Sequence, residues 1–254
     1  MQKLTSRDGT TIACEKTGQG PPVILVVGAF NDRLTGAPLA TFLAPRFTVF
    51  TYDRRGRGES GDAVEYAIQR EVEDLEELIR VAGGSASVFG YSSGAVLALM
   101  AAASHLAITR LALYEAPPAQ SSDHAAKLAA LIKAGRRGDA VEYFQARVVG
   151  IPEHVVAQLR HAPFRPGLER MAHSLVYDAT IISDPRSTEL FANVRQPTLA
   201  IAGGASAPVM GETAEAIARS LPNGRSLTID GATHDIVPAV LAPVLARFFL
   251  GSNE

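Results

Sequence analysis

The sequence predicts an α/β protein: a mostly parallel central sheet flanked by helices, with a small inserted helical cap. Short runs of apolar and β-branched residues, such as residues 23–27, are typical of strands buried on both faces, as in parallel sheets. Helix-like stretches separate these runs, which predicts right-handed strand–helix–strand units. Residues 119–189, by contrast, contain helical patterns and no convincing strand.

The first half of the chain alternates between strand-like and helix-like stretches. The turn signal Asp8-Gly9 precedes a strand-like run at residues 10–15, which predicts a hairpin with the residues before it. Residues 68–81 carry apolar side chains at helical spacing and are followed by Gly83-Gly84, a suitable C-cap. We expect a further helix at residues 95–104 and buried strands at residues 23–27, 47–52, 86–89 and 109–114.

The second half begins with a helical segment and then returns to the α/β pattern. We expect short helices at residues 125–133, 139–149, 153–160 and 168–179, separated by Gly and Pro. Strands at residues 197–202 and 226–229 and a helix at residues 240–250 follow. The resulting prediction is an α/β core made of residues 1–118 and 190–254, with a helical cap made of residues 119–189.

Composition excludes several classes of function. The 254-residue chain has a formal net charge of -2 and no Lys/Arg run, so we expect no nucleic-acid partner. Cys14 is the only cysteine, which excludes an internal disulfide and a multi-cysteine metal site. The N-terminus lacks a signal-peptide pattern, and the longest apolar run, residues 95–103, is shorter than the about 20 residues that span a bilayer. We therefore expect a cytoplasmic protein with no membrane partner, and leave its oligomeric state open.

One motif carries specific chemistry: Gly90-Tyr91-Ser92-Ser93-Gly94, between a buried strand and an Ala-rich helix. In that context Gly-x-Ser-x-Gly is a nucleophile elbow, a sharp turn that exposes the serine hydroxyl at the carboxyl end of the sheet. The helix N-terminus beneath it favours a developing negative charge. Ser92 is therefore the candidate nucleophile, and the alternative is a structural turn with an ordinary N-cap serine.

With this motif in place, nearly the whole chain resembles the α/β-hydrolase fold superfamily, and specifically serine esterases and lactonases. Residues 21–28 match the family's third strand and the start of its oxyanion loop. Residues 52–60, Tyr-Asp-Arg-Arg-Gly-Arg-Gly-Glu-Ser, resemble the Asp-x-Arg-Gly-x-Gly-x-Ser turn after the fourth strand. We interpret that turn as structural, with glycines that shape the loop and with Asp53 and Arg54 paired to nearby groups.

A serine nucleophile needs a base, and His234 is the candidate among six histidines. It follows the last predicted strand and precedes the last helix, where hydrolases of this family carry their catalytic histidine. His105 follows the helix after the elbow and suits a capping role. The remaining histidines lie in the predicted cap: His124, His154, His161 and His173.

The acid departs from the commonest family pattern. Most members place an Asp after the strand that corresponds to residues 198–202, but here the loop Gly203-Gly204-Ala205-Ser206-Ala207-Pro208 has no carboxylate. Some hydrolases of this fold, including certain haloalkane dehalogenases and a lactonase, instead place a Glu after the strand that follows the elbow. Glu115 occupies that position and is our candidate, with Asp178 and Asp235 as alternatives.

The oxyanion hole requires two backbone N–H donors. The resemblance implies Ser93, next to the nucleophile, as one donor. The family's His-Gly-x sequence is replaced here by Val27-Gly28-Ala29, so Ala29 is the expected second donor, with Phe30 beside it.

A serine triad forms an acyl-enzyme that water hydrolyses, so the expected substrate is a small carboxylic ester or lactone, and no metal or organic cofactor is implied. The predicted cap offers six apolar residues as candidate lining, although most of them can simply pack it onto the core: Leu128, Leu131, Ile132, Phe144, Leu175 and Val176. Two alternatives stay open. One is a C–C bond hydrolase or cofactor-free haloperoxidase, and the other is a non-hydrolytic ligand-binding protein on the same fold.

Overall fold

The computed structural model of the chain describes residues 1–120, 123–184 and 191–251. Its strands form one eight-stranded sheet in the order β1-β2-β4-β3-β5-β6-β7-β8. The strands are β1 (Gln2–Thr5), β2 (Thr11–Thr17), β3 (Pro22–Val26), β4 (Thr48–Tyr52), β5 (Ala86–Tyr91), β6 (Ile108–Tyr114), β7 (Thr198–Gly203) and β8 (Gly224–Ile229). β1 and β2 pair antiparallel around the predicted hairpin, β2 pairs antiparallel with β4, and the pairs from β4 to β8 are parallel. The predicted fold class is confirmed.

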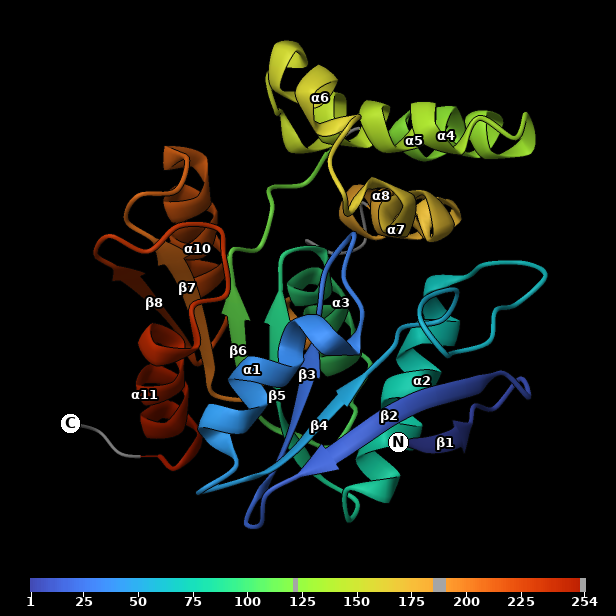
Figure 1. The fold of residues 1–254 in the computed structure, drawn as a ribbon. Helices are drawn as coiled ribbons and strands as arrows, with labels where there is room; N and C mark the ends of the chain where they lie inside the picture. The colour runs from blue at the N-terminus through green and yellow to red at the C-terminus, as the bar shows by residue number, and fades with distance from the viewer. Residues whose placement is uncertain (121–122, 185–190, 252–254) are drawn as a thin grey trace.

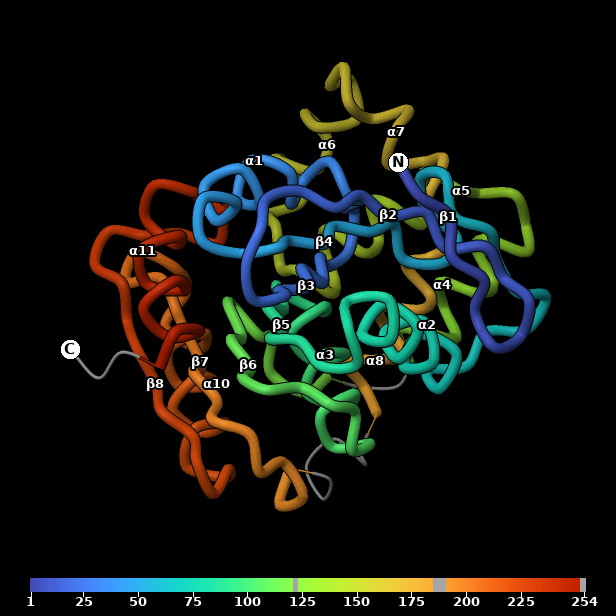
Figure 2. The backbone as a smooth tube through the Cα atoms, turned by 90° about the horizontal axis from the view of Figure 1, so that it is seen from below, coloured from blue at the N-terminus to red at the C-terminus, as the bar shows by residue number. Residues whose placement is uncertain are grey.

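Helices cover both faces of the sheet. One face carries α1 (Arg33–Leu43) and α11 (Pro238–Phe249), and the other carries α2 (Ile68–Val81), α3 (Ser93–Ala103) and α10 (Pro208–Ser220) (Figure 2). Neither α1 nor α10 is among the sequence predictions. Each contains helix-weakening residues, Pro38 in α1 and Gly211 in α10, and each is held by packing against the core.

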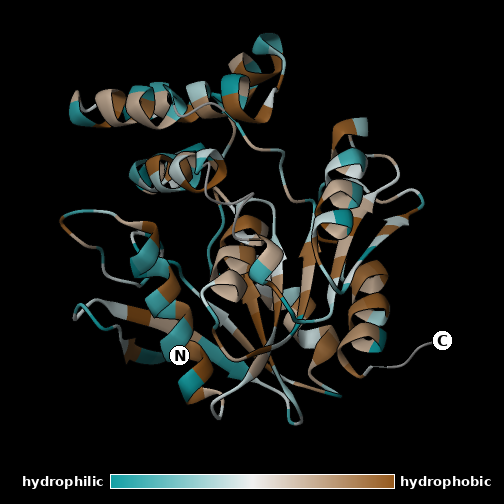
Figure 3. Ribbon diagram, turned by 180° about the vertical axis from the view of Figure 1, so that it is seen from behind, coloured by the Kyte–Doolittle hydropathy of each residue, from teal (hydrophilic) through white to brown (hydrophobic). Residues whose placement is uncertain are grey.

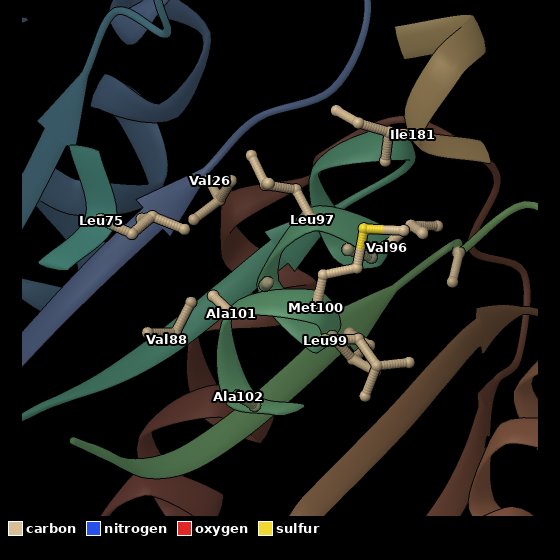
Figure 4. Close-up of a cluster of buried hydrophobic side chains, with 14 of the residues drawn as sticks. Val26, Leu75, Val88, Val96, Leu97, Leu99, Met100, Ala101, Ala102 and Ile181 are labelled. Carbon is tan, nitrogen blue, oxygen red and sulfur yellow. The ribbon is translucent and has the colours of Figure 1, made fainter. Parts of the chain in front are cut away.

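The centre of the molecule is apolar on every side. The central strands and α3 are mostly hydrophobic (Figure 3). All residues of α3 are buried, because the helix is covered by the sheet on one side and by neighbouring helices on the others. In Figure 4, Leu97 and Met100 of α3 lie between Val26 and Leu75 on one side and Ile181, from a later helix, on the other.

Between β6 and β7 the described residues form helices and no strand. They are α4 (Asp123–Lys133), α5 (Arg137–Tyr143), the π-helix η1 (Phe144–Val149), α6 (Glu153–Leu159), α7 (Arg165–Arg170), the 3₁₀ turn η2 (Ala172–Ser174) and α8 (Leu175–Ser183), and η3 (Phe191–Asn193) precedes β7. We call α4 to α8 the helical insertion. It lies beyond the ends of the sheet towards which the parallel strands point (Figure 1). The predicted cap boundary at residues 189 and 190 lies outside the described residues, and the division into core and cap stays a prediction.

Two helix predictions within this segment differ from the structure. The stretch 139–149 is a helix that widens into a π-helix from Phe144, a change that a hydrophobic pattern does not reveal. The stretch 168–179 is interrupted by η2, so α7 ends at Arg170 and α8 begins at Leu175. None of the helices in the described part of the chain is both long and apolar enough to cross a membrane.

Candidate active site

Ser92 lies at the sharp turn from β5 into α3. Its backbone has φ 55° and ψ -128°, a conformation that costs an ordinary residue about 1–3 kcal/mol and that functional sites retain. The two motif glycines allow the turn to pack: a Cβ on Gly90 would lie 2.6 Å from Ala95 Cα, and one on Gly94 would lie 2.4 Å from Val26 O. Larger side chains at either position would force the elbow apart.

Glu115 and His234 form a hydrogen-bonded pair although they lie 119 positions apart in the chain. His234 Nδ1 lies 3.0 Å from Glu115 Oε2. The other carboxylate oxygen, Oε1, accepts a hydrogen bond of 2.7 Å from the backbone amide of Gly203. With a carboxylate on Nδ1, the imidazole carries its proton there and leaves Nε2 free to accept one.

The Glu115 carboxylate is buried, with only 1% of the residue exposed. Burial alone would raise the pKa of this carboxyl, but hydrogen bonds from His234 and the Gly203 amide outweigh it and lower the pKa below its usual value. Glu115 therefore stays ionised beside the imidazole. Its own backbone has φ 53°, a second strained residue at this site.

The loop that carries His234 is fixed by the residue before Glu115. The Tyr114 hydroxyl donates hydrogen bonds to the carbonyl oxygens of Thr233 and Asp235, on either side of the histidine. The Tyr91 ring lies 5.1 Å from the imidazole, centroid to centroid, and is tilted by 45°. Two adjacent strands of the sheet thus determine where the imidazole sits.

A cavity of about 520 Å³ opens over these groups. The five residues predicted from the sequence as the site all line it: Ala29, Ser92, Ser93, Glu115 and His234. Its other described walls are mostly apolar and come from the segment after β6, from η1 and from the start of α10. Phe144 is the one residue of the six predicted cap lining residues that contributes, while Leu128 and Leu175 are buried in the core cluster.

The oxyanion loop, residues 27–31, approaches the elbow closely. A Cβ on Gly28 would lie 2.8 Å from Ser92 Cβ, so only glycine fits there. The Ala29 amide donates a hydrogen bond of 3.0 Å to Ser93 Oγ. The Ser93 amide is at the first position of α3, where a helix leaves its N–H groups without intrahelical acceptors. Both predicted oxyanion donors are therefore beside the nucleophile, with Ala29 engaged by the Ser93 side chain.

The two alternative candidates for the triad acid, Asp178 and Asp235, have other partners. Asp178 is completely buried and accepts hydrogen bonds from Arg54, Arg57 and Ser93. Burial alone would raise the pKa of Asp178, but Arg57 and Arg54 outweigh it and lower the pKa below its usual value. Asp235 is exposed and its side chain contacts Thr233. Neither carboxylate makes the hydrogen bond to His234 Nδ1 that Glu115 makes.

The turn after β4 is built as a structural element. Gly56 and Gly58 have φ of 74° and 51°, and a Cβ on Gly58 would lie 2.2 Å from an oxygen of Asp53. Asp53 pairs with Arg33 at 2.5 Å, and Arg54 makes a two-pronged ion pair with Glu71 at 2.6 and 2.7 Å. Each expected ion pair forms, with partners from α1 and α2.

Three buried residues have a role at this site that does not follow from the sequence patterns: Arg54, Arg57 and Asp178. Two signals pointed to them. Arginines are rarely buried unless paired, and here they follow a buried strand within a glycine turn. Asp178 is the only charged residue in α8, in a stretch that is otherwise apolar or neutral. Across the described residues no cluster of three or more His, Cys, Asp or Glu side chains is arranged to hold a metal ion.

Comparisons with known proteins agree with this fold. The sequence profile of the alpha/beta hydrolase family matches residues 23–245. An alpha/beta hydrolase from Sphaerobacter thermophilus DSM 20745 is 50% identical over 98% of this chain and 100% of its own, with a TM-score of 0.90.

More distant relatives share the fold. A thermophilic esterase from Thermogutta terrifontis has a TM-score of 0.79 at 24% identity over 98% of both chains. The enol-lactonase from Burkholderia xenovorans LB400 has a TM-score of 0.75 at 22% identity, over 99% of this chain and 100% of its own. The uncharacterized hydrolase YraK of Bacillus subtilis (strain 168) is 37% identical over 95 residues, and the match spans 36% of this chain and 35% of YraK.

Proposed function

Because the chain belongs to the alpha/beta hydrolase family, we propose that it is a serine hydrolase that cleaves a small carboxylic ester or lactone through an acyl-enzyme on Ser92. The observation that carries the proposal is the 3.0 Å contact between His234 Nδ1 and the buried Glu115 carboxylate, in the same cavity as the elbow serine. A buried carboxylate on Nδ1 prepares the imidazole to accept a proton at Nε2.

In this mechanism His234 takes the proton from the Ser92 hydroxyl as the oxygen attacks the substrate carbonyl. Glu115 orients the imidazole and stabilises the imidazolium that forms, without itself taking the proton. The Ser93 amide binds the developing oxyanion, and the Ala29 amide, which donates to Ser93 Oγ in this structure, shares its N–H with the oxyanion as it forms. The N-terminus of α3 contributes its positive end. The imidazolium then protonates the leaving alkoxide, and a water activated by the same histidine hydrolyses the acyl-enzyme.

The lining of the cavity supports an uncharged, largely apolar substrate. Among the described lining residues, Glu115 and His234 are the only Asp, Glu, His, Lys or Arg side chains, and each is hydrogen-bonded to the other. A substrate carboxylate would therefore be desolvated without a cationic partner, which is costly. A second, mostly apolar cavity of about 470 Å³ shares four wall residues with the first, which leaves room next to the site for an apolar substituent: Pro117, Pro118, Ile182 and Val209.

Hydrolysis of p-nitrophenyl esters of increasing acyl length tests the proposal, with wild type compared with Ser92→Ala, His234→Ala and Glu115→Gln. We expect wild-type turnover and losses of about 10³-fold or more in kcat for each folded variant, as for other triads. Wild-type protein that is inert towards esters and lactones yet cleaves a ketonic substrate would replace the proposal with C–C bond hydrolysis. A Ser92 that fails to react with an activated phosphonate would argue for a ligand-binding protein.

A further inference from the structure

The backbone of the oxyanion loop is held from behind by two buried arginines. Arg57 Nη1 donates hydrogen bonds to the carbonyl oxygens of Gly28, at 2.5 Å, and Asn31, at 3.2 Å. Arg54 Nη1 donates to the carbonyl of Val27 at 3.3 Å. Three carbonyl groups of this five-residue loop are therefore directed towards guanidinium groups in the interior.

This contact determines where the Ala29 amide points. The C=O and N–H of one trans peptide unit point in opposite directions, and the described chain contains no cis peptide bond. When Arg57 draws the Gly28 carbonyl inward, the N–H of the same peptide, which belongs to Ala29, points outward to the elbow. There it donates a hydrogen bond of 3.0 Å to Ser93 Oγ, on the residue next to the nucleophile.

Asp178 joins these groups into one cluster. Its Oδ2 accepts from Arg57 at 2.6 Å, and its Oδ1 accepts from Arg54 at 2.8 Å and from the Ser93 hydroxyl at 2.7 Å. The cluster is electrically balanced, because Glu71 supplies the second negative charge against the two arginines. All four ionised residues are at most 2% exposed, so the geometry cannot relax by exchanging partners with water.

Asp178 comes from the helical insertion and not from the sheet. It lies on α8, whose Ile181 packs beside Leu97 of α3 (Figure 4). The Asp178 carboxylate, which binds the arginines behind the oxyanion loop, therefore reaches this position because α8 packs against α3, the helix that begins at the nucleophile.

We propose that Asp178 is a positioning residue for the oxyanion hole, acting through Arg57 on the Gly28–Ala29 peptide and through Ser93 on the elbow. This role rests on the proposed function and adds to it a link between the docked insertion and transition-state binding. Asp178 does not orient the imidazole and is not the acid of the triad.

The test compares Asp178→Asn and Arg57→Lys with the matched control Asp62→Asn. Asp178→Asn keeps the size of the side chain and removes its charge. Arg57→Lys keeps the buried charge and loses the planar fork that spans Asp178 and Gly28 O. Asp62 accepts hydrogen bonds from Tyr177, the neighbour of Asp178 on α8, at 2.9 and 3.0 Å, and none of its recorded contacts involves the oxyanion loop.

Three quantities are measured on folded protein: kcat and KM for a p-nitrophenyl ester, the inhibition constant of n-butylboronic acid, and the acid limb of the pH–kcat profile. Removing one oxyanion donor costs roughly 10²–10³ in kcat, so misaiming one should cost about 10–100-fold. We expect both cluster variants to lose kcat by that factor, to bind the boronate more weakly by a similar factor, and to keep KM and the pH profile. Asp62→Asn should stay within about two-fold of wild type.

The proposal is overturned if a folded Arg57→Lys or Asp178→Asn protein keeps kcat and boronate affinity within two-fold of wild type. It is also overturned if only KM changes, or if Asp178→Asn shifts the pH profile as Glu115→Gln does, because the latter would make Asp178 a partner of the imidazole. Should Asp178→Asn not fold, Arg57→Lys decides alone. In each of these cases an active wild type and an inactive Ser92→Ala protein leave the proposed hydrolase function standing.

Discussion

The hydroxyl of Ser93 donates a hydrogen bond of 2.7 Å to the carboxylate of Asp178, a residue 85 positions further along the chain. The contact links the first residue of α3 with the middle of α8, and so links the elbow with the helical insertion. It also explains why an isolated carboxylate sits in an otherwise apolar helix. Two arginines and the Ser93 hydroxyl donate hydrogen bonds to the buried Asp178 carboxylate, and Asp178 in turn balances the charge of the arginines.

The first prediction concerns stability. Asp178→Ala removes one of two buried carboxylates, so the guanidinium groups of Arg54 and Arg57 have only the Glu71 carboxylate to balance their charges. Breaking a buried ion pair in this way costs about 3–5 kcal/mol of unfolding free energy. Urea denaturation followed by circular dichroism measures it, with the exposed pair of Arg219 and Glu215 as control, where Glu215→Ala should cost less than about 1 kcal/mol. Equal losses in the two variants would contradict the role of burial.

The second prediction concerns the acid. Glu115→Gln keeps the size of the side chain but presents a neutral group to His234 Nδ1, so the imidazolium of the transition state loses its counter-charge. We expect kcat to fall by about 10³–10⁴-fold with little change in KM. Asp178→Asn is the comparison, with its smaller expected loss. If Glu115→Gln retains more than a tenth of the wild-type kcat, the acid of the triad lies elsewhere.

The third prediction compares two glycines, one at a crowded position and one at an open position. In Gly28→Ala the new Cβ would lie 2.8 Å from Ser92 Cβ and 2.9 Å from Tyr91 O, so the oxyanion loop must retreat from the elbow. We expect kcat to fall by about 10²-fold or more, as for loss of an oxyanion donor. Gly211 lies inside α10 with nothing within 4 Å of a Cβ, so Gly211→Ala should keep activity and add about 0.5–1 kcal/mol of stability. Steady-state kinetics and thermal unfolding on both variants check the pair.

The sequence predicted those parts of the site that depend on local pattern. The elbow could be recognised because a strand, two glycines and a helix surround Ser92 within a few residues. Glu115 could be proposed because it directly follows the strand after the elbow, and His234 because it lies on the loop after the last strand. The places of these strands in the sheet follow from their order along the chain. Helices between the strands β6 and β7 could be predicted, whereas the π-helix η1 and the break before α8 could not, since both depend on packing.

The buried cluster of Arg54, Arg57, Glu71 and Asp178 could not be predicted from the sequence, for a different reason. Asp178 lies more than 120 positions from Arg54 and Arg57, and nothing local fixes the register with which α8 docks on α3. The sequence shows a carboxylate at position 178 but not its partners, so from the sequence alone Asp178 remains an alternative for the triad acid. The engagement of the Ala29 amide by Ser93 Oγ is likewise a result of that docking.

The fourth prediction concerns pH. The folded-state pKa of Glu115 is below its usual value, so the contact with His234 stabilises the fold fully above the unfolded pKa of about 4.3. The contribution declines as the pH falls below that value and is lost once the pH passes the folded-state pKa. The difference in unfolding free energy between wild type and Glu115→Gln should therefore shrink as the pH falls below about 4.3. A difference that grows as the pH falls below about 4.3 would mean that the carboxyl takes up its proton more readily in the folded state than in the unfolded state.

The fifth prediction concerns the charge of the substrate. The described walls of the cavity hold no cationic side chain apart from His234, which is paired with Glu115. A p-nitrophenyl hemisuccinate and a p-nitrophenyl valerate have similar length, but the first must bury a carboxylate without a partner. Partial desolvation of that charge should lower kcat/KM for the hemisuccinate by at least about ten-fold relative to the valerate.

A variant can reverse this preference if charge is its cause. Met210 lines the cavity at the start of α10, and Met210→Arg places a guanidinium at the wall without touching the triad. We expect the ratio of kcat/KM for hemisuccinate over valerate to rise by about ten-fold or more in Met210→Arg, and to stay near the wild-type ratio in the neutral control Met210→Gln. A wild type that already prefers the hemisuccinate would mean that a cationic group reaches the substrate from outside the described walls, and the preference for uncharged substrates would be abandoned.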